Sequence, residues 1–240
     1  MIIINNQNIY KPQHISNPMN TVLLLKQLDN YPVFTEKDII RITKTTKKYA
    51  RTLLSRLQKK GYIYRIERGK YSLYDDPLVF ASHLVKPAYL SLWTALRYYN
   101  LTQQQPKNIF VMVTSPKKKI TLPTTTINFV VTKQFWGYKT ERYRDFDIFI
   151  AEPEKAIIDC LLARLSIEYV IEAIELQQNH KKLVKYAQKT RNSSLIKRLG
   201  YLLEKYKQNV YGLKPSDYNY VPLNYARIKG KKDKRWRVIL

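Results

Sequence analysis

The sequence predicts an α+β protein of two domains, and three observations lead to this fold class. Residues 35–60 repeat their apolar positions with the period of a helix, and residues 62–74 switch to the alternation of a strand hairpin. Asp-Asp-Pro at residues 75–77 interrupts the pattern, and strand-like segments followed by helical segments come after it. We therefore expect one domain at residues 1–75 and a mixed α+β domain with several C-terminal helices at residues 76–240.

Two helices joined by a short turn are predicted between Thr35 and Lys60, after a first helix that opens near residue 17 and ends near residue 28. Thr35 and Asp38 have the spacing of a capping box for a helix at 36–42. A longer helix at 44–60 places its apolar side chains on one stripe, and its opposite face is basic and rich in hydroxyl groups. No acidic residue occurs between residues 41 and 66.

A basic hairpin follows, with strands at 62–66 and 70–74 and glycines at positions 61 and 69, where a helix end and a turn need them. Two helices, a short turn and a basic hairpin are the layout of a winged helix-turn-helix, whose second helix enters the major groove of DNA. The groove candidates are Lys44, Thr45, Thr46, Lys48, Arg51, Thr52 and Ser55. The phosphate candidates on the hairpin are Arg65, Arg68 and Lys70, unless they only protect an exposed strand edge.

The charge balance favours a polyanionic partner, because 43 Lys and Arg against 18 Asp and Glu give a net charge of +25 and a pI of about 9.9. A membrane surface is disfavoured, because the sequence has no long apolar run, signal peptide or lipidation motif. We expect a cytoplasmic protein that binds double-stranded DNA. The single cysteine, Cys160, excludes a disulfide framework and a cysteine-based zinc site.

The second domain is predicted to contain a short helix at 78–84, a buried helix at 89–99, strands at 109–114, 120–122, 127–132 and 145–150, and helices from residue 152 to 207. A basic tail at 229–237 surrounds one tryptophan. A second basic surface on the C-terminal helices is formed by Lys181, Lys182, Lys185, Lys189, Arg191, Lys197 and Arg198. It is either a solvated face or a contact for flanking DNA, a partner protein or RNA.

Enzyme chemistry is not predicted. The carboxylates near residues 145–154 lack the lysine spacing of a metal-dependent nuclease, the three histidines are scattered, and no phosphate-binding loop or nucleophile motif occurs. We expect no catalytic residues, metal or cofactor.

Four segments together resemble the AbiEi-type antitoxins of type IV toxin–antitoxin systems, which take part in phage defence. They are the helix-turn-helix with its hairpin, the helix Tyr-Leu-Ser-Leu-Trp-Thr-Ala-Leu at 89–96, the strand at 109–114, and Ala-Glu-Pro-Glu-Lys-Ala-Ile-Ile-Asp at 151–159. The last of these, placed downstream of the 89–96 helix, is the most specific. The resemblance covers nearly the whole chain.

The resemblance implies a repressor that binds inverted repeats in its own promoter and counters a nucleotidyltransferase toxin. Palindromic operators mirror protein two-fold symmetry, so two copies are expected on each operator, whether the free protein is a monomer or a dimer. The alternatives are a winged-helix regulator without a toxin, and an interaction protein that neutralises a partner enzyme and binds DNA only non-specifically.

Overall fold

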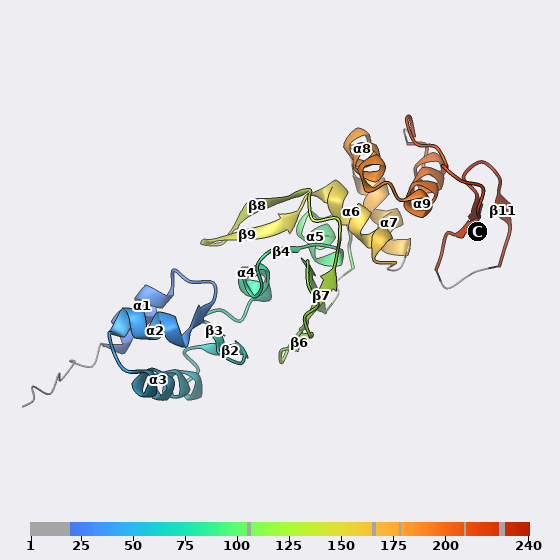
Figure 1. The fold of residues 1–240 in the computed structure, drawn as a ribbon. Coiled ribbons are helices and arrows are strands. Elements are labelled where there is room, and N and C mark those ends of the chain that lie inside the picture. The colour runs from blue at the N-terminus through green and yellow to red at the C-terminus, as the bar shows by residue number, and fades with distance from the viewer. Residues whose placement is uncertain (1–19, 105–106, 165–166, 178, 209, 226–228) are drawn as a thin grey trace, which may run out of the picture.

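The computed structural model describes residues 20–104, 107–164, 167–177, 179–208, 210–225 and 229–240 (Figure 1). Over these ranges the chain has the mixed α+β character that the sequence predicts. The predicted start of the first helix near residue 17 lies outside the described residues. Helix α1 (Thr21–Leu28) is capped by Asn20, whose side-chain oxygen accepts a 3.0 Å hydrogen bond from the backbone N–H of Val22.

Three helices and a small sheet form an N-terminal unit, which we define as residues 20–74. Helices α2 (Glu36–Thr43) and α3 (Lys47–Lys59) follow α1. The sheet has the order β1-β3-β2, from strands β1 (Phe34–Thr35), β2 (Tyr64–Glu67) and β3 (Lys70–Ser72). Its buried core consists of Leu24, Leu28, Phe34, Ile39, Ala50, Leu53, Leu54, Leu57 and Ile63. The apolar stripe of the predicted second helix is therefore the face that α3 buries.

Helix α3 begins three residues later than the sequence predicts. Lys44 has φ 54°, a left-handed conformation that ends α2, and Thr46 caps α3 by accepting a 3.3 Å bond from the backbone N–H of Tyr49. Lys44, Thr45 and Thr46 therefore belong to the turn between the two helices. Gly61 and Gly69 have φ of 73° and 80°, as expected for a helix end and a tight turn.

The remainder of the described chain is built on a six-stranded mixed sheet of order β6-β7-β5-β4-β9-β8. Its strands are β4 (Ala88–Leu90), β5 (Asn108–Val113), β6 (Ile120–Thr121), β7 (Thr126–Val131), β8 (Tyr138–Tyr143) and β9 (Phe146–Ala151). The predicted helix at 89–99 is wrong in its first part, because residues 88–90 form strand β4 and helix α5 covers only Trp93–Tyr98. A short strand buried on both faces is uniformly apolar, so its pattern does not distinguish it from a buried helix.

Helices cover the sheet and gather beyond one end of it (Figure 1). Helix α4 (Pro77–Phe80) and a 3₁₀ turn, η1 (Ala81–His83), connect the N-terminal unit to the sheet. The C-terminal helices are α6 (Pro153–Leu162), α7 (Ile167–Leu176), α8 (His180–Thr190) and α9 (Ser193–Lys205).

A buried polar network ties α6 to β4. The Lys155 ammonium donates to the Asp159 carboxylate one turn later on α6 and to the Tyr89 hydroxyl at 3.0 Å, and Ser91 donates to the same carboxylate at 2.8 Å. Burial raises the pKa of Asp159 and lowers that of Lys155, while the ion pair opposes both shifts. The segments at 89–96 and 151–159 thus meet in the core.

The basic C-terminal tail is folded back onto α9. Strands β10 (Val221–Pro222), β11 (Lys232–Asp233) and β12 (Val238–Ile239) form a small sheet of order β10-β12-β11. Trp236 is 2% exposed, lies against Gly200 and donates its indole N–H to Glu204. The tail is therefore anchored by its tryptophan.

Candidate nucleic-acid interface

The outer face of α3 is an exposed row of cationic and hydroxyl side chains. Lys48, Arg51, Thr52 and Ser55 are all exposed on it. In the preceding turn Lys44 and Thr46 are exposed, while Thr45 is half-buried and hydrogen-bonded at 2.7 Å to the Thr43 hydroxyl. We call these seven sequence-predicted residues the α3 ridge.

One carboxylate reaches the α3 ridge from a neighbouring helix. Glu36, at the start of α2, forms a 2.7 Å ion pair with the guanidinium Nε of Arg51, whose side chain stays 64% exposed. The absence of acids within residues 42–65 did not reveal this partner, because α2 brings it from outside that segment. Arg51 must leave Glu36 before its guanidinium contacts a base edge through the same nitrogen.

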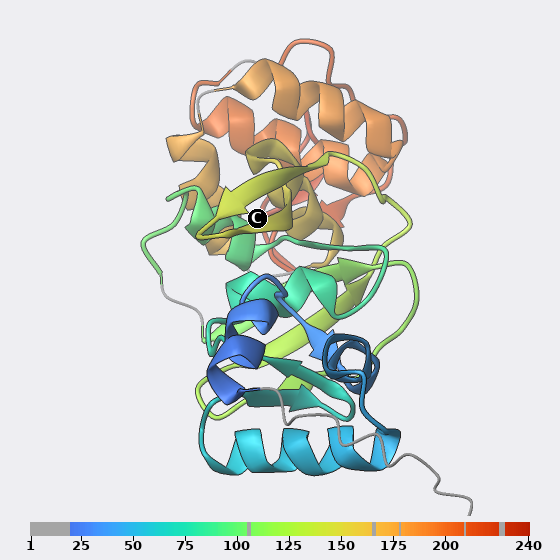
Figure 2. The same ribbon diagram turned by 90° about the vertical axis from the view of Figure 1, so that its left-hand side faces the viewer.

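The α3 ridge faces away from the rest of the chain. Helix α3 forms one end of the molecule, and α8 and α9 lie at the other end (Figure 2). The described second half of the chain therefore leaves the ridge accessible to a large partner.

The hairpin supplies two exposed cations rather than three. Arg65 and Arg68 are exposed. Lys70 is half-buried, donates to the backbone carbonyl of Leu84 and forms a 2.9 Å ion pair with Glu67. The prediction that Lys70 is a phosphate contact is therefore corrected: its ammonium holds the hairpin against the second half of the chain.

A loop of three lysines that is not among the predicted DNA contacts lies beside the hairpin. Lys117, in the loop between β5 and β6, forms a 2.7 Å ion pair with Glu67 of β2, and the next two residues, Lys118 and Lys119, are exposed. Burial disfavours the Glu67 carboxylate, but its bonds to Lys117 and Lys70 outweigh this effect and lower its pKa. The run of three lysines was visible in the sequence, but its position next to the hairpin depends on the tertiary fold.

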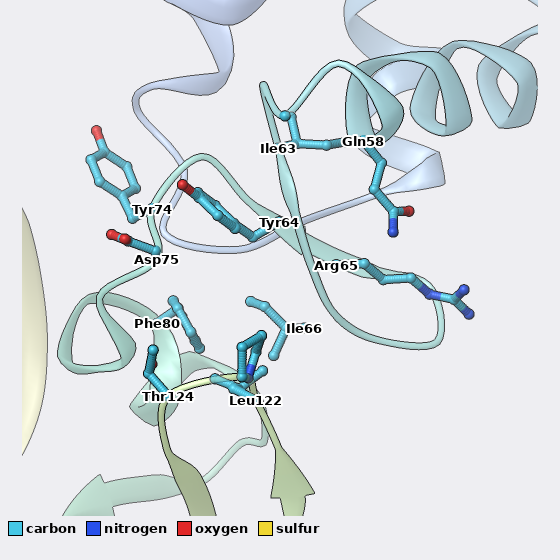
Figure 3. Close-up of a pocket in the computed structure, with 12 residues that line it drawn as sticks. Gln58, Ile63, Tyr64, Arg65, Ile66, Tyr74, Asp75, Phe80, Leu122 and Thr124 are labelled. Carbon is cyan, nitrogen blue, oxygen red and sulfur yellow. The ribbon is translucent and has the colours of Figure 1, made fainter. Parts of the chain in front are cut away.

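A cavity of about 430 Å³ lies between the hairpin and the turn that joins β6 to β7. Tyr64, Arg65 and Tyr74 line it together with Leu122, and the side chains of Tyr64 and Arg65 extend in different directions (Figure 3). Below the hairpin, Ile66 is 5% exposed and packs into the core of the second half. The two halves are thus in direct contact, and the hairpin forms part of that contact.

The predicted second basic surface is only partly a surface. Lys197 is 1% exposed and ion-paired with Asp217, and Arg198 is 8% exposed and donates to the Pro222 carbonyl at 2.8 Å. These two predictions are corrected, because α9 turns both side chains inward, where Lys197 holds the segment before β10 and Arg198 holds β10 itself.

The other cations of this set lie on or just after α8. Lys182 is half-buried and paired with Glu152 at 2.9 Å and Glu154 at 3.3 Å. The exposed members are Lys181, Lys185, Lys189 and Arg191.

Two further properties of the described residues bear on function. The described residues contain no cluster of His, Cys, Asp and Glu side chains with the arrangement of a metal site. Likewise, none of the helices in the described ranges has the length and apolar character needed to cross a membrane.

The N-terminal unit is similar to a known family of regulators. A family model described as "Transcriptional regulator, AbiEi antitoxin" matches residues 23–74, from α1 to the end of the hairpin. The match covers under a quarter of the chain, so it shows that this part of the chain is similar to regulatory antitoxins. No curated protein matches the chain.

Proposed function

We propose that this protein is a sequence-specific DNA-binding repressor whose N-terminal unit is a winged helix-turn-helix and whose domain boundary lies at residues 75–76. The observation that carries the proposal is the α3 ridge, an exposed cationic face at the end of the molecule with its apolar side buried. An α-helix of this kind fits the major groove, and the β2–β3 hairpin lies along the adjacent backbone.

The proposed contacts divide into base readout and phosphate binding. Arg51 contacts a guanine, because its fork of donors matches the O6 and N7 acceptors of that base. Thr45, Thr52 and Ser55 contact phosphates or thymine methyl groups, and Lys48 contacts phosphate. Arg68 on the hairpin contacts phosphate, and the exposed members of the β5–β6 lysine loop extend this contact beyond the hairpin.

We further propose that two copies bind the arms of an inverted repeat in the protein's own promoter. Half-sites bound by such dimers lie about 34–36 Å apart, one helical turn of DNA. The similarity to AbiEi antitoxins supports autoregulation of an operon that also encodes a nucleotidyltransferase toxin, which this protein counters.

Binding to the DNA upstream of the gene tests the repressor proposal. In a fluorescence-anisotropy titration we expect at least about 10³-fold tighter binding to that duplex than to a shuffled duplex of equal length. Arg51→Ala should reduce this ratio, whereas Arg68→Ala should weaken both duplexes alike and flatten the salt slope by about 0.9. Lys70→Ala is the matched hairpin control and should not change the slope. Equal affinity of the wild-type protein for the upstream duplex and the shuffled duplex would overturn sequence-specific repression.

Co-expression tests the antitoxin proposal separately. A nucleotidyltransferase gene beside this one is expected, and its absence would favour a regulator without a toxin. Where the gene is present, full-length protein carrying Lys48→Glu and Arg68→Glu should lose operator binding and still relieve toxicity, because the second half of the chain is unchanged. Loss of both activities would show that relief depends on DNA binding.

A further inference from the structure

Exposed cations form a strip on α8, at the opposite end of the molecule from the α3 ridge (Figure 2). Lys181, Lys185 and Lys189 recur every four residues, so they lie on one side of the helix about 6 Å apart along its axis, and Arg191 follows at its C-terminal end. All four are exposed, and α8 contains no acidic residue. The strip lies at the far end of the molecule from α3, so a straight duplex bound at α3 would leave it exposed.

A groove of about 530 Å³ runs between α8 and the loop around residue 212. The loop is fixed to the helix, because the side-chain amide of Gln188 donates to the carbonyl of Gly212 at 2.6 Å and Leu213 is buried. Gly212 has φ 87°, a conformation that L side chains rarely adopt, so the backbone of this loop favours glycine at this position. The loop consequently presents Tyr211, 88% exposed, on a backbone that is held in place.

We propose that this groove binds single-stranded nucleic acid, with Lys181 and Lys185 on the phosphates and Tyr211 stacked on an unpaired base. Proteins that bind single strands combine two features: cationic side chains along the nucleic-acid backbone, and aromatic rings on which the bases stack. A duplex keeps its base faces covered, so it would use the lysines and leave the ring without a role. An acidic protein would likewise engage only the charges.

The test is fluorescence anisotropy on the full chain with labelled single-stranded RNA and single-stranded DNA of about 12 nucleotides and mixed sequence, and a duplex of equal length. We expect Lys181→Glu with Lys185→Glu to weaken single-strand binding by tenfold or more and duplex binding by less than about twofold. Tyr211→Ala should weaken single-strand binding by about tenfold, and Tyr211→Phe should retain it, because the ring is kept. Comparison of the two single strands shows whether the 2′-hydroxyl is read.

Lys231→Glu with Lys234→Glu is the charge-matched control at the two ends of β11, where both lysines are exposed. Equal weakening by this pair and by the α8 pair would overturn the proposal, since it would show a diffuse charge effect. Equal single-strand binding by the Tyr211→Ala variant and the wild type would also overturn the proposal. So would a larger loss of duplex binding than of single-strand binding in the variant with Lys181→Glu and Lys185→Glu. Lys48→Glu on α3 should leave single-strand binding unchanged, so failure of the repressor proposal does not affect this result.

Discussion

The ion pair between Arg51 and Glu36 predicts that one substitution, Glu36→Gln, should increase DNA affinity rather than reduce it. Arg51 is exposed and joined to Glu36 at 2.7 Å, so a base contact through its Nε requires that this pair be broken. An exposed pair of this kind contributes about 0.2–1 kcal/mol. Glu36→Gln removes this cost and a negative charge near the phosphates. The variant should therefore bind the operator roughly 1.5- to 5-fold more tightly than the wild type.

The assay is an anisotropy titration of the operator duplex between 50 and 200 mM salt. If Arg51 reads a base, Glu36→Gln should leave the slope of log affinity against log salt unchanged. If the released guanidinium binds a phosphate, the slope should become steeper by about 0.9. In an Arg51→Ala background most of the gain should disappear, because the pair no longer exists to be broken.

Two controls separate binding from stability and from total charge. Glu36 lies in the first turn of α2, where a carboxylate interacts with the helix dipole, so its loss costs about 0.3–1 kcal/mol of stability. A thermal melt measures this effect independently of DNA. Glu175→Gln, an exposed site on α7, changes the net charge equally and should leave operator affinity unchanged. Unchanged or weaker binding by a fully folded Glu36→Gln variant would refute the placement of Arg51 at the interface.

Three further predictions concern the core and the junction. Lys155→Met should cost about 3–5 kcal/mol of unfolding free energy at pH 7, measured with urea, because it leaves Asp159 buried without its partner. Burial raises the folded-state pKa of that carboxyl above its unfolded value, so the penalty should shrink as the pH falls through the folded pKa, and a pH-independent penalty would contradict this account. Gly200→Ala would place a Cβ 2.0 Å from the Trp236 ring and should cost about 1–3 kcal/mol with a red shift of tryptophan fluorescence, whereas an unshifted spectrum would show that the ring is not packed there. Lys117→Ala removes the ion pair with Glu67 of the hairpin and should weaken binding to operator and shuffled DNA equally, as measured by anisotropy. A selective loss of operator binding would contradict the proposal that this loop lies beside the phosphates.

The sequence predicted local structure well where one face of an element is apolar and the other is not. Helix α3 shows this: Leu53, Leu54 and Leu57 are buried, and the opposite face is exposed. Strand β4 was missed, because it is buried on both faces and has no alternation to read. Edge strand β8 was missed for the opposite reason, since its residues are largely polar and exposed and its pairing with β9 holds it.

The candidate site was predicted less completely, because side-chain charge alone does not reveal which cations are paired. In the sequence, Lys197 and Arg198 look the same as exposed cations, yet the fold buries Lys197 against the segment before β10 and Arg198 against β10. Glu36 and Lys117 were missed for a related reason. Each reaches the candidate interface from another element, and only the packing of that element determines the contact.

The distribution of paired and exposed cations limits how much of the net charge of +25 can act on DNA at one time. Lys70, Lys182 and Lys197 hold elements together, and the α8 strip lies at the far end from α3. At the α3 end the exposed cations of the proposed interface, apart from Arg51 on a base, are Lys44, Lys48, Arg65, Arg68, Lys118 and Lys119. Neutralisation of about six phosphates by these side chains should give a salt slope for duplex DNA of about −5. A slope much steeper than this would mean that the duplex bends around the molecule to reach α8, and a much shallower one would mean that the hairpin and lysine loop do not touch the backbone.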